Sequence, residues 1–199
     1  AGQSCCSVER IYVHEAVAAR FIEAFVTCVK GFVVGAPDND ATYIGPLARS
    51  AQVAVLEAQV ADAVAKGGTV LVGGKKHALG GSYFEPTVVT NVNHTMAIMR
   101  EESFGPIIGI QVVKSDDEAI ALMNDTDYGL TAGVYCKDET RARGILEQVN
   151  AGSVYWNCCD RVSPRLPWTG RRGSGIGSTL GVLGIRAFVQ PKAWHARKA

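Results

Sequence analysis

The chain has 199 residues, of which 47% are hydrophobic and 20% are charged, a composition typical of one ordinary globular domain. Twenty Lys and Arg residues against 19 Asp and Glu residues leave a formal charge of +1, which excludes the strong basic field typical of proteins that bind nucleic acids or anionic membranes. No apolar run is long enough to span a bilayer, and the first residues lack the pattern of a signal peptide. The partners we expect are therefore small molecules and other protein subunits.

Six cysteines stand at positions 5, 6, 28, 136, 158 and 159. A disulfide framework is typical of short secreted chains with small cores, so we expect reduced thiols and a cytoplasmic location. Four of the cysteines form two vicinal pairs, Cys5-Cys6 and Cys158-Cys159. Vicinal cysteines lack the intervening residues that let two thiolates reach one tetrahedral zinc ion. We therefore predict no metal site.

Short β-prone runs alternate with helical repeats along the chain. Arg10 to Val13 is β-prone, and the stretch from His14 to about Gly31 carries apolar residues at helical spacing. From Ser50 to Lys66 apolar residues again recur at intervals of three and four, with Ser50 as a candidate N-cap and Gly67-Gly68 after the last turn. The pattern predicts one strand followed by two helices.

The middle of the chain contains three more candidate strands, the first of them predicted to be buried. They are Thr69 to Val72, Pro86 to Val92 and Ile107 to Val113. Ser115 to Glu118 then has the spacing of a capping box ahead of a helix.

The second half continues the alternation. Two strands, Thr131 to Cys136 and Ser153 to Trp156, flank a helix from about Glu139 to Val149. Arg186 to Gln190 is a last β-prone run before a basic tail. Strands that alternate with helices predict an α/β fold with a mostly parallel, twisted sheet and flanking helices.

Cys5 is a candidate nucleophile. It follows Gly2-Gln3-Ser4, in which the glycine lets backbone donors approach a reacting carbonyl group closely. A cysteine attacks as its thiolate, which requires exposure and a nearby cation, base or helix N-terminus. Taken by itself, this segment favours the alternative, a small buried hydrophobic side chain.

A second candidate site is the segment Glu101-Glu102-Ser103-Phe104-Gly105-Pro106, which precedes a predicted strand. A carboxylate at the edge of a sheet can accept hydrogen bonds from sugar hydroxyls, and an aromatic side chain can pack against a flat ring. The alternative is a solvated acidic turn in which Phe104 fills the core, and spacing alone favours it.

Together the two segments resemble the motifs of a known family. Gly2-Gln3-Ser4-Cys5 resembles the nucleophile motif of the NAD(P)-dependent aldehyde dehydrogenase superfamily, and Glu101 to Pro106 resembles its cofactor motif. Further matches in the same order are Gly45-Pro46, Gly73-Gly74, Pro86-Thr87-Val88, Asn124 with Tyr128-Gly129-Leu130, Ala151-Gly152 with Asn157, and Pro167-Trp168. The resemblance covers essentially the whole chain.

The resemblance implies a role for three residues. Cys5 is implied to attack the aldehyde and form a thiohemiacetal, from which hydride transfer to NAD or NADP leaves a thioester that water hydrolyses to the carboxylic acid. Glu102 is implied to bind the nicotinamide ribose, and Phe104 to line the same site. The sequence does not choose between NAD and NADP.

The stretch from Asn157 to Gly170 resembles the loop that lines the aldehyde entrance in this family. Asn157, Val162 and Trp168 are the implied lining residues, which suits an apolar aldehyde tail. Two arginines, Arg161 and Arg165, would suit an anionic tail, although two solvated loop side chains are the simpler interpretation.

Two positions depart from the family pattern in this region. Thr169 replaces a usual glycine, and Ser178-Thr179 stands where an Arg-Glu pair is common. The anchoring of the loop, and with it the substrate class, is therefore left open.

The resemblance implies a catalytic domain over residues 1–183 and an oligomerisation strand with a tail over residues 184–199. The family's cofactor-binding domain, general-base glutamate and oxyanion asparagine would precede Ala1, so we expect the isolated chain to lack full activity. Arg186 to Gln190 would pair with other subunits in a dimer or tetramer. The alternative is a catalytically silent domain kept for assembly.

Overall fold

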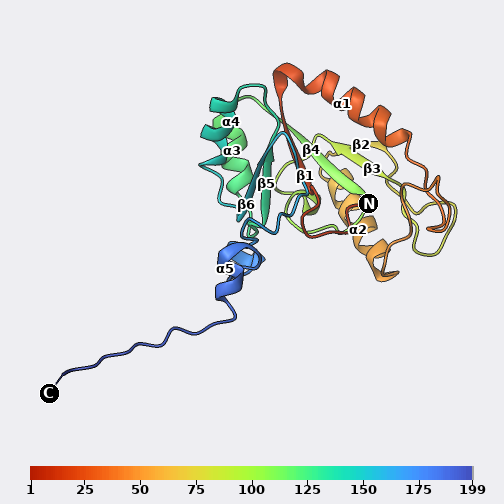
Figure 1. The fold of residues 1–199 in the computed structure, drawn as a ribbon. Coiled ribbons are helices and arrows are strands. Elements are labelled where there is room, and N and C mark those ends of the chain that lie inside the picture. Colours follow the sequence, from red (N-terminus) through yellow and green to blue (C-terminus); the bar gives the residue numbers. More distant parts are fainter. Residues whose placement is uncertain (199) are drawn as a thin grey trace. The chain divides into compact units, whose positions relative to one another are not determined.

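The computed structural model describes residues 1–198, which divide into two compact units. The first unit is Ala1–Met123, and the second begins at Asn124. Figure 1 shows the elements of both units in chain order. Each unit is described by itself.

The first unit is built on a four-stranded sheet with the strand order β1-β4-β3-β2. β1 and β3 both run parallel to the central strand β4, whereas β2 is an antiparallel edge strand. β2 is only half-buried, so the expectation of a buried strand there was wrong; one side of an edge strand is open to solvent. The elements are β1 (Arg10–His14), α1 (Glu15–Lys30), α2 (Ala51–Ala65), β2 (Thr69–Val72), β3 (Thr87–Thr90), the 3-10 turn η1 (Ala97–Met99), β4 (Ile107–Val113) and α3 (Asp116–Asn124).

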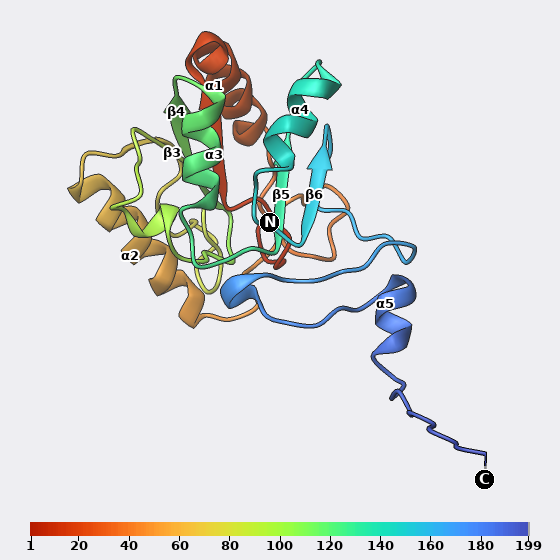
Figure 2. The same ribbon diagram turned by 90° about the vertical axis from the view of Figure 1, so that its left-hand side faces the viewer.

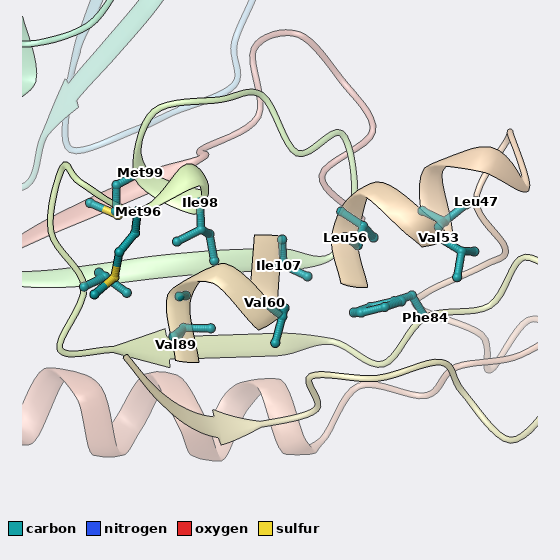
Figure 3. Packing of buried hydrophobic residues seen from close by; sticks show 12 residues of the cluster. Leu47, Val53, Leu56, Val60, Phe84, Val89, Met96, Ile98, Met99 and Ile107 are labelled. Carbon is teal, nitrogen blue, oxygen red and sulfur yellow. The ribbon is translucent and has the colours of Figure 1, made fainter. Parts of the chain in front are cut away.

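Helices α1 and α2 cover opposite faces of this sheet, as Figure 1 shows. The apolar side of α2 packs with Val89 of β3 and Ile107 of β4 in the cluster shown in Figure 3. At its centre Leu56 is fully buried, a contribution of about 1.5–3 kcal/mol for a side chain of this size. On the other face, Ile110 of β4 packs in the cluster that includes α1. A sheet covered on both sides forms a rigid base for the loops at its edges.

The predicted helix ends are largely found. Ser115 Oγ accepts the backbone N–H of Glu118 at 3.1 Å, and the Glu118 carboxylate reaches back to the N–H of Lys114 at 2.7 Å. This is a variant of the capping box, in which the glutamate would accept the N–H of Ser115 itself. Ser50 precedes α2 as expected, but its side chain makes no capping hydrogen bond. Gly67, just after α2, has a positive φ of 96°, a conformation that glycine adopts without strain.

The second unit contains a separate two-stranded parallel sheet, in which Val134 of β5 pairs with Trp156 of β6. Helix α4 contacts both strands, as Figure 2 shows. The elements are β5 (Thr131–Val134), α4 (Glu139–Leu146), β6 (Ser153–Trp156), the 3-10 turn η2 (Arg172–Ser174) and α5 (Gly181–Arg186). The expected α/β class with mostly parallel strands and flanking helices is confirmed.

The expected strand from Arg186 to Gln190 is not formed. Helix α5 ends at Arg186, and the next three N–H groups donate to carbonyl oxygens three residues earlier, at 3.1–3.3 Å. An edge strand needs a partner strand for its backbone hydrogen bonds. In the single chain, residues 187–189 extend the end of α5 with these turns, and pairing of this run with another subunit stays a prediction.

Among residues 1–198, no helix combines the length and the apolar character needed to cross a bilayer.

Candidate active site

Cys5 lies in a turn that leads into β1. The N–H of Ser7 donates to the carbonyl oxygen of Ser4 at 3.0 Å, which closes the turn around the two cysteines. Cys5 is exposed, whereas Cys6 is buried, with its sulfur 3.2 Å from Ser4 Oγ. Cys5 is therefore the thiol of this pair that a substrate can reach.

The glycine that begins this segment packs directly on the second motif. Gly2 has a φ of 70°, and a Cβ added there would lie 2.1 Å from the carbonyl oxygen of Gly105. A Cβ on Gly105 would in turn lie 2.5 Å from Leu56 of α2. Neither position has room for a side chain, so the segment of Cys5 and the segment of Glu102 and Phe104 lie against each other.

Gln3 connects the turn of Cys5 to the loop that precedes α2. Its side-chain amide donates to the carbonyl oxygen of Pro46 at 3.2 Å and accepts the N–H of Ala48 at 2.8 Å. Both ends of the amide are used, so this loop before α2 is fixed next to Cys5.

Glu102 and Phe104 lie in the loop that precedes β4. Glu102 is exposed, and Phe104 is half-buried. Between them Ser103 is completely buried and therefore anchors the loop. Phe104 has a φ of 45°, a left-handed conformation that costs a residue with a side chain about 1–2 kcal/mol.

The Glu9 carboxylate compensates for this strained conformation. Its two oxygens accept the N–H of Ser103 at 3.1 Å and the N–H of Phe104 at 3.3 Å. Burial raises the pKa of the Glu9 carboxyl above its usual range, opposed by these two backbone hydrogen bonds, and the nearby charge of Glu102 raises it further. A half-buried acid is thus held where two backbone donors face it.

Two glutamines of α2 hold the other side of the loop. Gln52 Nε2 donates to the carbonyl oxygen of Ser103 at 2.6 Å, and Gln59 Nε2 donates to that of Glu102 at 3.3 Å. Gln59 is 2% exposed, so this contact lies in the protein interior.

The exposed side of the loop presents a carboxylate and part of an aromatic side chain. Glu102 offers an exposed carboxylate on a fixed backbone, which can accept hydrogen bonds from a ribose diol. Phe104 offers part of an aromatic face next to it. Within residues 1–198, no three His, Cys, Asp or Glu side chains are grouped as metal ligands.

The predicted aldehyde-lining residues lie in the second unit. Asn157 has a φ of 53°, and its side-chain amide accepts the N–H of Cys136 and donates to the carbonyl oxygen of Cys136, both at 3.0 Å. Val162 is 56% exposed. Trp168 is half-buried and is hydrogen-bonded through its backbone to Thr179 at 2.7 and 2.9 Å. The amide of Asn157 is therefore occupied by the backbone.

The departures from the family pattern have local structural roles. Thr169 Oγ1 donates to the carbonyl oxygen of Gly177 at 2.6 Å, and Thr179 forms the bridge to Trp168. These contacts tie the two sides of the loop together. Arg161 and Arg165 are exposed.

Sequence reasoning missed Glu9 and Gln59. Glu9 lies 94 residues from Ser103 in sequence, and Gln59 lies 43 residues from Glu102. One signal was available for Gln59, since it is a polar residue among the apolar positions that α2 buries. No local pattern marked Glu9.

A model of the aldehyde dehydrogenase family matches residues 1–194. The chain is 41% identical to an aldehyde dehydrogenase of Paenarthrobacter nicotinovorans over 191 residues, which is 96% of this chain and 42% of that protein. It is 35% identical to the chloroplastic betaine aldehyde dehydrogenase of Atriplex hortensis over 193 residues, which is 96% of this chain and 38% of that protein.

The fold is similar to solved structures of the same kind. A betaine aldehyde dehydrogenase from Staphylococcus aureus, solved with NAD⁺, superimposes with a TM-score of 0.91 at 34% identity, over 94% of this chain and 39% of that one. An NADP-dependent enzyme of E. coli gives a TM-score of 0.93 at 33% identity, over 96% and 40%. The chain thus spans about two fifths of the length of the relatives it matches. On the family match and these relatives together, the chain belongs to the aldehyde dehydrogenase family.

Proposed function

We propose that this chain carries the nucleophile and the nicotinamide-ribose residue of an NAD(P)-dependent aldehyde dehydrogenase, an oxidoreductase that converts an aldehyde to a carboxylic acid. The observation that carries the proposal is the packing of the Cys5 segment against the Glu102 segment, with Gly2 on Gly105. Two motifs about a hundred residues apart are thereby brought together at the ends where the parallel strands β1 and β4 begin, each with an exposed side chain.

In the proposed reaction the Cys5 thiolate attacks the aldehyde carbon and forms a thiohemiacetal. The backbone N–H of Cys5 donates to the developing oxyanion, an interaction whose loss in other enzymes costs a few kcal/mol. Loss of hydride from the thiohemiacetal carbon leaves a thioester, and water cleaves it to the acid and the free thiol. Glu102 binds the ribose hydroxyls of the nicotinamide nucleotide, which supplies the hydride acceptor when bound.

The test traps the covalent intermediate. The full-length protein is mixed with an aldehyde and NAD⁺ or NADP⁺, quenched in acid and mapped by mass spectrometry. We expect the acyl group on the peptide that contains Cys5, and we expect Cys5→Ser to abolish both acylation and turnover. Cys28→Ser is the matched control, because Cys28 is also exposed but lies at the far end of α1. Full activity in Cys5→Ser would refute the proposal.

We also propose that residues 1–199 alone do not sustain full turnover. The chain matches about two fifths of its relatives, and help from a general base in thioester hydrolysis is worth about 10²–10⁴-fold in rate. Glu102 and Phe104 contact only the nicotinamide end of a dinucleotide in this scheme. Calorimetry should therefore detect negligible binding of NAD⁺ or NADP⁺ to the isolated chain, and micromolar binding would contradict this part of the proposal.

For the substrate we propose an aldehyde with an apolar tail, because Val162 and Trp168 present apolar surface in the second unit. Arg161 and Arg165 are exposed there as well and would favour an anionic tail instead. A screen of aliphatic, aromatic, amino and carboxylated aldehydes on the full-length protein separates the two, since a preference for carboxylated aldehydes would contradict the apolar assignment.

The segment around α5 favours a role in assembly as well. Ile185, Phe188 and Trp194 are 71%, 91% and 83% exposed. Ile185 and Phe188 line the same surface hollow, and exposed apolar side chains that lie together are typical of interaction surfaces. We propose that this segment contacts other copies of the protein, in a reducing compartment such as the cytoplasm that suits six free thiols. Phe188→Asp should lower the oligomeric state measured by analytical ultracentrifugation. If assembly persists without any aldehyde oxidation by the full-length protein, the silent assembly domain becomes the better description.

A further inference from the structure

The backbone of residues 102–104 is held by side chains from two other parts of the first unit. Two successive N–H groups, those of Ser103 and Phe104, donate to the Glu9 carboxylate. Two successive carbonyl groups, those of Glu102 and Ser103, accept from Gln59 and Gln52. The loop is thus fixed on one side by the nucleophile segment and on the other by α2.

Of the three side chains that hold this loop, Glu9 is the one that belongs to the same segment of the chain as Cys5. It lies four residues after Cys5 and directly before β1. The side chain of Arg10, the first residue of β1, donates to the carbonyl oxygen of Met99 at 3.2 Å. The Glu102 loop is therefore hydrogen-bonded to the same stretch of backbone that carries Cys5.

The cost of this arrangement indicates that it is more than ordinary packing. A half-buried carboxylate loses hydrogen bonds to water, and protein donors must replace them. Glu9 gives its two oxygens to a loop in which Phe104 adopts a left-handed conformation, and positions with such strain cluster at ligand sites.

We propose that Glu9 is a positioning residue for the cofactor site, which holds Glu102 and Phe104 at a fixed place relative to the turn that carries Cys5. The proposal rests on the proposed function, because it takes Glu102 to be the ribose ligand. Glu9 does not touch the substrate or the cofactor; it acts through the backbone of Ser103 and Phe104.

The first measurement needs no cofactor. Amide hydrogen exchange of the wild-type chain should show Ser103 and Phe104 strongly protected, and Glu9→Gln should speed exchange at these two amides by about tenfold. The reason is that the Gln side chain keeps one acceptor oxygen but turns an N–H group toward the second amide. Exchange of both wild-type amides at the rate of an unstructured peptide would overturn the proposal without any variant.

The second measurement uses the full-length protein. Glu9→Gln should raise the KM for NAD⁺ or NADP⁺ by about tenfold and change kcat by less than about threefold, the signature of lost binding rather than lost chemistry. Glu9→Asp keeps the carboxylate but is one methylene shorter, so its KM should lie between those of wild type and Glu9→Gln. It replaces Glu9→Gln in this test if Glu9→Gln does not fold. Glu23→Gln is the matched control, an exposed acid of α1 outside both segments that should leave KM and kcat unchanged.

The Glu102→Gln variant separates the two proposals. If it leaves the cofactor KM unchanged, Glu102 is not the ribose ligand and the proposed function fails at that residue. If Glu102→Gln raises KM but Glu9→Gln and Glu9→Asp leave it at the wild-type value, the positioning role of Glu9 is wrong while the proposed function stands.

Discussion

Gly2 lies so close to Gly105 that a single added methyl group at Gly2 would stand 2.1 Å from the carbonyl oxygen of Gly105. One glycine begins the segment of Cys5 and the other belongs to the segment of Glu102 and Phe104, so the two segments are in direct backbone contact. Their glycines are needed for this contact as well as for local turns. Loss of the contact should therefore affect stability and both motifs together.

Gly2→Ala should destabilise the fold by about 2–4 kcal/mol, because the new Cβ meets backbone atoms that cannot rotate away and because φ is positive. Gly80→Ala is the matched control, since Gly80 has nearly the same φ, 71°, and no atom within 4 Å of an added Cβ. The control should cost only about 1 kcal/mol. Urea unfolding compares the two variants, and equal costs would show that the close contact is absent in solution.

The reactivity of Cys5 can be tested against a second exposed thiol. Iodoacetamide should alkylate Cys5 about tenfold faster than Cys28, because Cys5 is the proposed nucleophile, whereas Cys28 lies in the last turn of α1, outside the proposed site. Cys136, which is half-buried, should also react more slowly than Cys5. Mass-spectrometric mapping of early time points measures the three rates, and a Cys5 rate no higher than that of Cys28 would contradict its assignment as nucleophile.

Most helices and strands could be predicted because the residue patterns that define them lie within short stretches of the sequence. The bounds of β2, β4 and β6 were predicted to the residue, since each is a short run of β-prone residues bounded by turn or loop residues. The β-prone run from Arg186 to Gln190 forms no strand within the single chain, because β-prone residues form a strand only where a neighbour supplies hydrogen bonds; its pairing with another subunit stays a prediction.

The candidate site was likewise predicted only in part. Motif resemblance pointed to Cys5, Glu102 and Phe104, and the structure places all three in one unit with Cys5 and Glu102 exposed. The residue that joins the two motifs, Glu9, has no motif of its own and acquires its role only when residues 94 positions apart meet. Contacts of this kind depend on the tertiary fold and leave no periodic trace in a sequence.

Glu9 should also make stability depend on pH in a defined direction. Its pKa is raised above the ordinary value of 4.5 in the folded protein, chiefly by burial, so the folded state binds more protons than the unfolded chain between the two pKa values. The free energy of unfolding contributed by Glu9 is therefore fully present below pH 4.5 and is lost as pH rises through the folded pKa.

Glu9→Gln removes this dependence because its amide does not titrate. The difference in unfolding free energy between Glu9→Gln and wild type should therefore rise in favour of the variant as pH increases from about 4 to about 8. Urea denaturation at several pH values measures it. A difference that falls with pH would mean that Glu9 is stabilised as the anion.

Asn157 should prove to be chiefly a structural residue of the second unit. Asn157→Ala removes both hydrogen bonds to the backbone of Cys136 and places an alanine at a φ of 53°, which should cost about 2–3 kcal/mol of unfolding free energy. Asn157→Gly removes the same two bonds but tolerates the backbone conformation, so it should be about 1 kcal/mol less destabilising than Asn157→Ala. Urea unfolding of the two variants separates the hydrogen-bond contribution from the backbone strain. If neither variant changes stability while aldehyde oxidation by the full-length protein falls, Asn157 acts on the substrate, and the bonds to Cys136 do not explain its presence.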